Sequence, residues 1–307
     1  MQETKAMKVL VAIDDSGASQ YVIAEALTRP WPTGAVLCVQ CVLDMWTLDE
    51  VPELVEEAKH QVKSLVAAVA CELTRSGYEV VSEIQAGVPK KGIVEYAKKW
   101  GADLIMVGSH RSSAVARFFV GSVAQAVLRA APCSVEIVRP SPRGSTASSP
   151  GMKIIVGTDG SECSLVAAHA VADRPWPTGT LVRVISVREP LAPESAMYIS
   201  YQTLYPADLA EEVLESERLR AEAALASTRQ ILSTAGLKLC DSSRTSFGDP
   251  RSVLLDEAEL WGADLVVVGS HGLHGFDRLL LGSVSETVAM HARCSVEVIR
   301  DGARTRE

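Results

Sequence analysis

The sequence lacks the features that mark several classes of protein. Its 307 residues include only seven cysteines, and aromatic residues make up 5% of the chain. So few cysteines in a chain this long exclude a secreted fold built on disulfides. No apolar run is long enough to span a bilayer, and residues 1–8 lead to a strand without the apolar segment of a signal peptide. We therefore expect a soluble cytoplasmic protein that does not bind membranes.

Basic tracts and metal-ligand spacings are also lacking. The net charge is −8 at pH 7, and without a long run of Lys or Arg we expect no nucleic-acid partner. His169, His274 and His291 do not have the spacing of metal ligands. His110 and His271 stand beside glycines, but no nucleophile, base and orienting group accompany them. The sequence thus predicts no metal site and no catalytic residue.

Cys38 and Cys41 form a CxxC motif inside a predicted strand. Side chains alternate along a strand, so residues three apart point to opposite faces and the two thiols diverge. We interpret both as core cysteines rather than as a redox or metal pair.

The chain contains an internal repeat. Residues 29–34 recur identically at 174–179, and residues 100–104 recur identically at 261–265. The first pair lies 145 positions apart and the second 161, so the second copy carries an insertion between these markers. We predict a first domain at 1–139, a Pro-, Gly- and Ser-rich linker at 140–151 and a second domain at 152–307.

The insertion falls around residues 191–207 and contains Tyr198, Tyr201 and Tyr205. It shows neither strand alternation nor a clear apolar stripe. A lid over the second site or a docking loop for a partner is one interpretation. A surface loop folded onto its own domain is the other, and it is the one we favour.

Short apolar runs alternate with amphipathic patterns in each copy, in the order βαβαβαβαβ. The expected strands are 9–13, 35–43, 78–84, 103–107 and 134–138, then 154–158, 180–187, 237–245, 264–268 and 295–299. This order predicts an α/β fold with two doubly wound domains. Two similar domains in one chain are expected to pack as a pseudo-symmetric pair. Since final strands can also pair between chains, a homodimer is compatible with the sequence.

An aspartate ends the first strand of each copy, at Asp14 and Asp159. The carboxyl ends of parallel strands face the ligand crevice of such a sheet. A turn or capping role is the alternative interpretation. Ser16 and Ser161, two residues later, are candidates for capping the next helix.

The stretch after the fourth strand of the second copy has the pattern of a phosphate site. A buried strand at 264–268 is followed by a loop with several glycines, of which Gly269, Gly272 and Gly282 are the candidates for binding phosphate. Ser283 stands three residues before Glu286, which is the spacing of a capping box at a helix start. Glycines let the backbone approach an anion, and the first free N–H groups of the helix point at it.

These motifs, taken in order, resemble the universal stress protein family. The motifs are the Asp after strand one, Gly-x-Pro before helix three, Gly-Ala-Asp-Leu before strand four, and the loop G-x2-G-x9-G-[S/T]. The resemblance covers both halves except the linker, the tail and the insertion, so the whole is similar to a tandem universal stress protein. It implies a five-stranded parallel sheet of order 3-2-1-4-5, flanked by helices, in each domain. In the ATP-binding branch it also implies ATP, or AMP or ADP, held by the loop, with Mg²⁺ as a candidate companion.

The resemblance implies roles for individual residues of the second copy. Asp159 would face the adenosine, and Val187 and Val268 would flank the adenine. The ribose and phosphates would be held by Gly269, Gly272, Gly282, Ser283 and Val284. Arg278 is a candidate phosphate partner because of its charge, although a surface role is equally compatible.

The first copy departs from the loop pattern at one position. Its equivalent residues are Asp14, Val42, Val107, Gly108, Arg111, Gly121, Ser122 and Val123. Arg111 stands where the second copy has Gly272. If the loop needs φ > 0 or a close backbone approach there, arginine cannot supply it cheaply. Arg111 either fills and silences the first site or contacts phosphate directly; the glycine argument favours an impaired first site.

We therefore expect an adenine-nucleotide-binding stress response protein. It would act as a regulator or sensor through nucleotide-dependent conformation or through an unidentified protein partner, and the second domain would be the better site. A slow Mg²⁺-dependent ATPase is one alternative. A nucleotide-independent scaffold that uses the tyrosine insertion for docking is the other.

Overall fold

The computed structural model describes residues 6–44, 52–109, 120–141, 151–188, 207–272 and 281–301. The first half contains β1 (Lys8–Ala12), α1 (Gly17–Thr28), β2 (Val36–Leu43), α2 (Pro52–Arg75), β3 (Glu79–Ala86), α3 (Pro89–Trp100), β4 (Leu104–Gly108), α4 (Ser122–Ala130) and β5 (Ser134–Val138). The second half contains β6 (Lys153–Thr158), α5 (Glu162–Ala172), β7 (Leu181–Arg188), α7 (Ala207–Thr234), β8 (Lys238–Leu239), β9 (Arg244–Phe247), α8 (Pro250–Trp261), β10 (Leu265–Gly269), α9 (Ser283–His291) and β11 (Ser295–Ile299).

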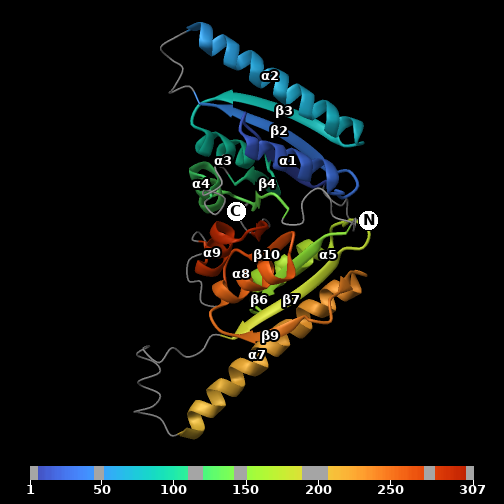
Figure 1. The fold of residues 1–307 in the computed structure, drawn as a ribbon, viewed down its shortest axis with the longest axis vertical. Helices are drawn as coiled ribbons and strands as arrows, with labels where there is room; N and C mark the ends of the chain where they lie inside the picture. The colour runs from blue at the N-terminus through green and yellow to red at the C-terminus, as the bar shows by residue number, and fades with distance from the viewer. Residues whose placement is uncertain are drawn as a thin grey trace.

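The described strands form one continuous sheet of eleven strands. Its order is β3-β2-β1-β4-β5-β11-β10-β6-β7-β8, and β9 also pairs with β7. Within each half the pairs are parallel and the order is 3-2-1-4-5, as predicted. The halves join through the antiparallel pair β5–β11, so they stack along the long axis, with α2 and α7 at opposite ends (Figure 1).

Helices cover both faces of the sheet. On one face a single apolar cluster crosses the junction between the halves and includes buried residues of α3, α4, α8 and α9. On the other face each half has its own cluster, packed under α1 and α2 or under α5 and α7. Strand alternation produces this division: Leu10 packs on the shared face, whereas Val9 and Val11 pack on the other.

The CxxC prediction is confirmed by this division into faces. Cys38 belongs to the shared cluster and Cys41 to the cluster on the opposite face. Both thiols are free, and burial raises the pKa of each to about 11. Thiols held protonated on opposite faces of a sheet do not suit redox or metal chemistry.

The predicted single strand at 237–245 is wrong, because a turn splits it into β8 and β9. The amide N–H of Ser243 donates to the carbonyl of Cys240 at 3.1 Å, which closes the turn. The Ser243 hydroxyl accepts from the N–H of Val184 on β7 at 3.0 Å. A side-chain oxygen thus replaces the backbone carbonyl that a continuous strand would offer to this N–H. Serine side chains favour such local bonds, and hydrophobic alternation alone does not reveal them.

Arginines reach across the junction in both directions. Arg139, which follows β5, donates from Nη2 to the carbonyl of Ala289 at 2.6 Å and from Nη1 to that of Cys294 at 3.2 Å. Arg300, which follows β11, donates from Nη2 to the carbonyl of Leu128 at 2.9 Å. Burial lowers the pKa of Arg139 to about 10. Each half therefore supplies cations to the end of the other half's last helix, where carbonyls are left without helical partners.

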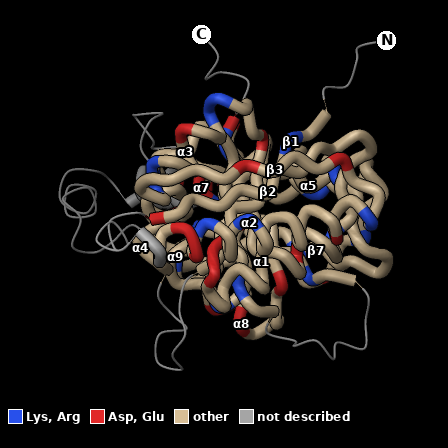
Figure 2. The backbone as a smooth tube through the Cα atoms, turned by 90° about the horizontal axis from the view of Figure 1, so that it is seen from above, with Lys and Arg blue, Asp and Glu red and all other residues tan. Residues whose placement is uncertain are grey.

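Three further properties bear on what the molecule can contact. Basic and acidic residues are interspersed along the backbone (Figure 2). Among the described residues, no helix combines the length and the apolarity that crossing a bilayer requires. Since β5 and β11 pair with each other, both edges of each final strand are already occupied within one chain.

Candidate functional site

The predicted site residues gather at the carboxyl edge of the sheet in the first half. Seven of the eight line one cavity of about 290 Å³: Asp14, Val42, Val107, Gly108, Gly121, Ser122 and Val123. The eighth, Arg111, lies outside the described residues. The cavity is near the lower limit of ~300–1,000 Å³ that is usual for ligand pockets. The fold thus brings the ends of β1, β2 and β4 and the start of α4 around one hollow.

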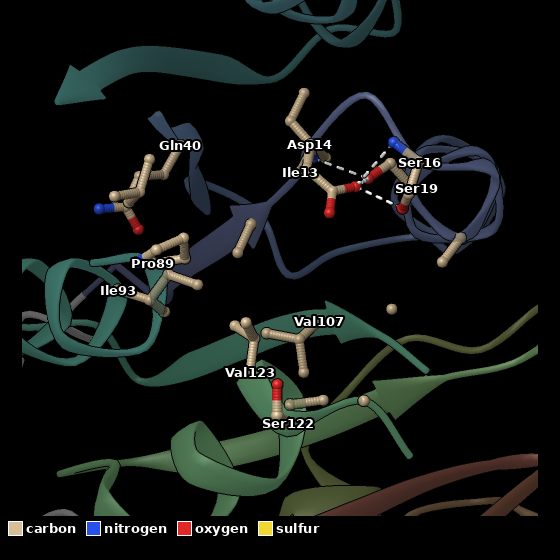
Figure 3. Close-up of a pocket in the computed structure, with 16 residues that line it drawn as sticks. Ile13, Asp14, Ser16, Ser19, Gln40, Pro89, Ile93, Val107, Ser122 and Val123 are labelled. Carbon is tan, nitrogen blue, oxygen red and sulfur yellow. Dashed lines mark hydrogen bonds between the residues drawn. The ribbon is translucent and has the colours of Figure 1, made fainter. Parts of the chain in front are cut away.

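The cavity is polar on the side of α1 and mainly apolar on the opposite side, where Gln40 lies beside Pro89 (Figure 3). Asp14, Ser16 and Ser19 lie together at the start of α1, whereas Pro89 and Ile93 lie on the opposite side. Val42 and Val107 add to the apolar lining. Such a lining suits a ligand with a flat apolar body and a polar group at one end.

Asp14 also organises the start of α1. Its Oδ1 accepts from the Ser16 amide N–H at 3.0 Å and from the Ser19 hydroxyl at 2.6 Å. Its own amide N–H donates to the Ser19 hydroxyl oxygen at 2.8 Å. The turn interpretation of this aspartate is therefore correct, and the same residue lines the cavity. These bonds fix the carboxylate at the cavity edge.

Sixteen residues line the cavity, and nine of them were not predicted as site residues. Gln40, Pro89 and Ile93 are three of these nine whose positions in a strand or helix pattern offered a signal. Gln40 stands two positions before Val42 on β2, so strand alternation places both on one face. Pro89 and Ile93 are four apart at the start of α3 and share a helix face in the same way. Gln40 donates from Nε2 to the carbonyl of Gly92 at 3.3 Å, while its Oε1 is buried without a partner.

In the second half, Gly272 lies against Asp159. A Cβ atom added to Gly272 would stand 2.6 Å from Asp159 Oδ2, far inside van der Waals contact. The φ angle of Gly272 is not in the left-handed region, so backbone conformation does not require glycine here; a larger residue would instead force the Asp159 carboxylate to shift. Asp159 Oδ1 accepts from the Ser161 amide N–H at 3.0 Å, which holds the carboxylate near the loop.

The two ends of the second glycine loop are joined. The amide N–H of Gly282 donates to the carbonyl of Ser270 at 2.8 Å, and the Ser285 hydroxyl donates to the same carbonyl at 3.1 Å. Residues 273–280, including Arg278 and His274, lie outside the described residues. Because the Gly282 amide closes the loop, the N–H groups available to an anion begin with Ser283 and Val284, the first helical residues.

The capping-box prediction for Ser283 is wrong. Gly282 is the N-cap residue of α9, Ser283 is the first helical residue, and no side chain caps this end. The first helical bond runs from the Glu286 amide to the Gly282 carbonyl at 2.9 Å, so the helix begins at Ser283 as predicted and its cap lies one residue earlier than predicted. In α5 the predicted cap is confirmed, since the Ser161 hydroxyl accepts from the Ser164 amide at 3.2 Å. In α1, Ser16 occupies the cap position without a side-chain cap bond.

Gly269 and Gly108 serve packing where each fourth strand ends. A Cβ on Gly269 would lie 2.7 Å from the backbone carbonyl carbon of Cys163, at the start of α5. A Cβ on Gly108 would lie 2.9 Å from the Cβ of Ala18, at the start of α1. Glycine at these positions therefore has a structural reason that is independent of any ligand.

The three valines of the second site border one apolar cluster. Val268 is buried in the shared cluster, and Val187 and Val284 pack against it. Gly157 replaces Ala12 in this half, and a Cβ there would lie 3.1 Å from Val268 and 3.2 Å from Leu254. Leu254 and Val268 thus approach the β6 backbone more closely than a larger residue would allow.

The contacts that the structure gives His271 are local. Its Nδ1 lies 2.9 Å from the Ser270 hydroxyl, and its carbonyl accepts from the Ser161 hydroxyl at 3.5 Å. Its buried Nε2 has no partner. Within the described ranges, no group of three or more His, Cys, Asp or Glu residues is arranged to hold a metal ion.

Comparisons with known proteins agree on one family. The family model described as "Universal stress protein family" matches residues 5–139 and 152–300. A universal stress protein of Staphylococcus epidermidis is 33% identical over 151 residues, which span 48% of this chain and 82% of that protein. A universal stress protein structure from Archaeoglobus fulgidus has a TM-score of 0.62 and 19% identity, covering 96% of this chain and 97% of the other. One from Pseudomonas aeruginosa has a TM-score of 0.59 and 17% identity, covering 96% and 93%.

Proposed function

The chain belongs to the universal stress protein family, with two copies of the family's domain, and from this premise we propose that it binds an adenine nucleotide. The ligand is ATP, AMP or ADP, held at the carboxyl edge of the sheet. The nucleotide acts as a regulatory signal through conformation or partner binding. The convergence of seven predicted residues on one cavity carries this proposal. We keep the division into domains at 1–139 and 152–307 as part of it.

The described residues fit such a ligand. The apolar side of the cavity, with Val42, Ile93 and Val107, suits the faces of a base. The orphaned Oε1 of Gln40 leaves an unsatisfied acceptor in the wall. Ser122 and Val123 begin α4, whose first N–H groups suit an anion. Any Mg²⁺ would be held chiefly by the nucleotide's phosphates, as is usual for this ion.

We propose that the second domain is the better site. Gly272 allows the loop to lie against Asp159, so that the carboxylate and the loop backbone meet one ligand from two sides. Val187 and Val268 would flank the base, while Gly269, Gly282, Ser283 and Val284 would surround the ribose and phosphates. The first domain has the cavity but carries Arg111 where the second has Gly272. We expect this first site to be the weaker one.

Thermal unfolding of the full chain with ATP, ADP, AMP and GTP tests the proposal. A ligand at 100 times its Kd adds ~2.7 kcal/mol to stability, so adenine nucleotides should raise the melting temperature and GTP should do so much less. No shift with any adenine nucleotide at millimolar concentration would reject the proposal and favour the scaffold.

A hydrolysis assay separates a regulator from a slow ATPase. We expect no product above background with Mg²⁺ and ATP, because the described residues assemble no nucleophile with a base and an orienting group. Mg²⁺-dependent turnover that disappears in Asp159→Ala would instead identify an enzyme.

A further inference from the structure

A buried cluster of charged residues lies where the two domains join. Glu136 on β5 and Glu297 on β11 are directly opposite in the antiparallel pair, and both are fully buried. Arg29 donates to the two carboxylate oxygens of Glu136, at 2.7 Å each. Arg174 donates from Nη1 to both oxygens of Glu297, at 2.7 and 2.8 Å. The repeat thus places two equivalent ion pairs side by side at the centre of the sheet.

The cluster has one carboxylate too many. Glu25 on α1 also accepts from Arg29, at 2.9 Å from Nε and 2.6 Å from Nη2. The equivalent position of the second domain is Ala170. Three carboxylates therefore face two guanidinium groups. Glu136 and Glu297 are shielded from water, whereas the Glu25 side chain is 22% exposed, so solvent screens the negative charge only at the Glu25 end of the cluster.

Arg29 is held by both domains at once. Its guanidinium lies 5.4 Å from the ring centroid of Trp31 in its own domain and 5.5 Å from that of Trp176 in the other. Cations attract aromatic faces at such distances. A change in the charge of this cluster therefore acts on the junction and not on one domain alone.

We propose that the buried Glu136 carboxylate at the centre of this cluster takes up one proton from solvent as the pH falls through neutrality, and that this proton strengthens the pairing of the two domains. The proton binds a carboxylate oxygen and brings the cluster from a net charge of −1 to neutrality. The junction then acts as a pH-sensitive element built into the fold.

The electrostatics of Glu136 agree with this geometry. Burial raises its pKa to about 7, with Glu25 and Glu297 adding to the increase and Arg29 opposing it. The groups that face it are Arg29 and Glu25 from the end of α1 and Glu297 from β11, with Arg174 behind Glu297. Since the folded pKa lies above the ordinary value of 4.5, the stabilisation is complete below pH 4.5 and is lost as the pH rises through 7.

Urea unfolding of the full chain between pH 5 and pH 8 tests the proposal. For wild type we expect the unfolding equilibrium constant to rise by about 10- to 100-fold more over this range than for Glu136→Gln. Glutamine has the shape of the protonated side chain but cannot titrate. Glu286→Gln is the control, because Glu286 forms the more exposed pair with Arg129 across the same junction; it should keep the wild-type dependence.

Two further measurements keep the proposal falsifiable if Glu136→Gln folds poorly. Glu25→Gln restores the balance of two carboxylates and two guanidinium groups, so it should also flatten the pH dependence. Carbon-13 NMR of labelled glutamate in wild type should show a carboxyl resonance that titrates near neutral pH. Equal pH dependence in wild type and both variants, or no glutamate titrating above pH 5.5, would overturn the proposal.

Discussion

Gly269 lies where the end of β10 packs closely against the start of α5, and glycine has no side chain to obstruct this contact. A Cβ there would meet the backbone of Cys163 at 2.7 Å, and backbone cannot move aside without shifting α5. We expect Gly269→Ala to lower stability by about 1–3 kcal/mol. Urea unfolding measures this. Gly17→Ala is the matched control, because an added Cβ there meets nothing within 4 Å; an equal loss in both variants would contradict the packing role.

The same residue shows what sequence can predict at this scale. The positions of the loop glycines were recognisable from their spacing, but the reasons for them were not. Gly269 serves helix packing, and Gly272 serves an approach to Asp159, which is more than a hundred residues away in the chain. Such reasons depend on which backbone segments meet across the fold. Gln40 was missed for a similar reason, since a polar residue in a buried strand does not indicate by itself that it borders a cavity.

Among the helices and strands, the N-termini of α1 and α5 can be compared directly, because the repeat makes them equivalent. Ser161 caps α5 through its hydroxyl, whereas Ser16 at the equivalent position of α1 makes no cap bond. Loss of a cap typically costs ~1 kcal/mol. Ser161→Ala should therefore destabilise the protein by about that amount and Ser16→Ala by less, as measured by chemical unfolding. A larger loss in Ser16→Ala would contradict this assignment.

The order of helices and strands was predictable, because the periodicity of apolar residues distinguishes the two directly in the sequence. Every predicted strand of the first half has a counterpart, and the order 3-2-1-4-5 holds in both halves. The third strand of the second half was not predictable as two pieces, since its turn depends on Ser243 bonding to the neighbouring β7. The start of α9 at Ser283 was predicted correctly, but Ser283 was wrongly given the cap role that Gly282 occupies.

At the scale of the whole molecule, the repeat predicted that the two domains would pack together but not that their sheets would join into one. A pseudo-symmetric pair was expected, but the antiparallel pairing of β5 with β11 and the arginines that cross it depend on surfaces far apart in sequence. The buried opposition of Glu136 and Glu297 follows from that register alone. Local patterns carry no information about it.

Arg139 tests how strongly the halves depend on each other. Arg139→Leu removes the donor to two buried carbonyls and leaves both without this partner, at a cost of about 1–3 kcal/mol for each buried polar group left unsatisfied. We expect a fall in the urea midpoint and easier proteolysis at the junction. Arg129→Ala removes an exposed pair and should cost less than ~1 kcal/mol. A negligible loss in Arg139→Leu would show that the sheet pairing alone holds the halves.

Calorimetric titration of ATP into three forms of the full chain tests the central claim most directly. Wild type should bind with its tighter site in the second domain. Gly272→Arg should lose that tighter site, because even the Cβ of the new side chain would displace the Asp159 carboxylate. Arg111→Gly, the matched change in the first domain, should strengthen binding there. If Gly272→Arg binds ATP with unchanged affinity and stoichiometry, the second-domain site is wrongly assigned.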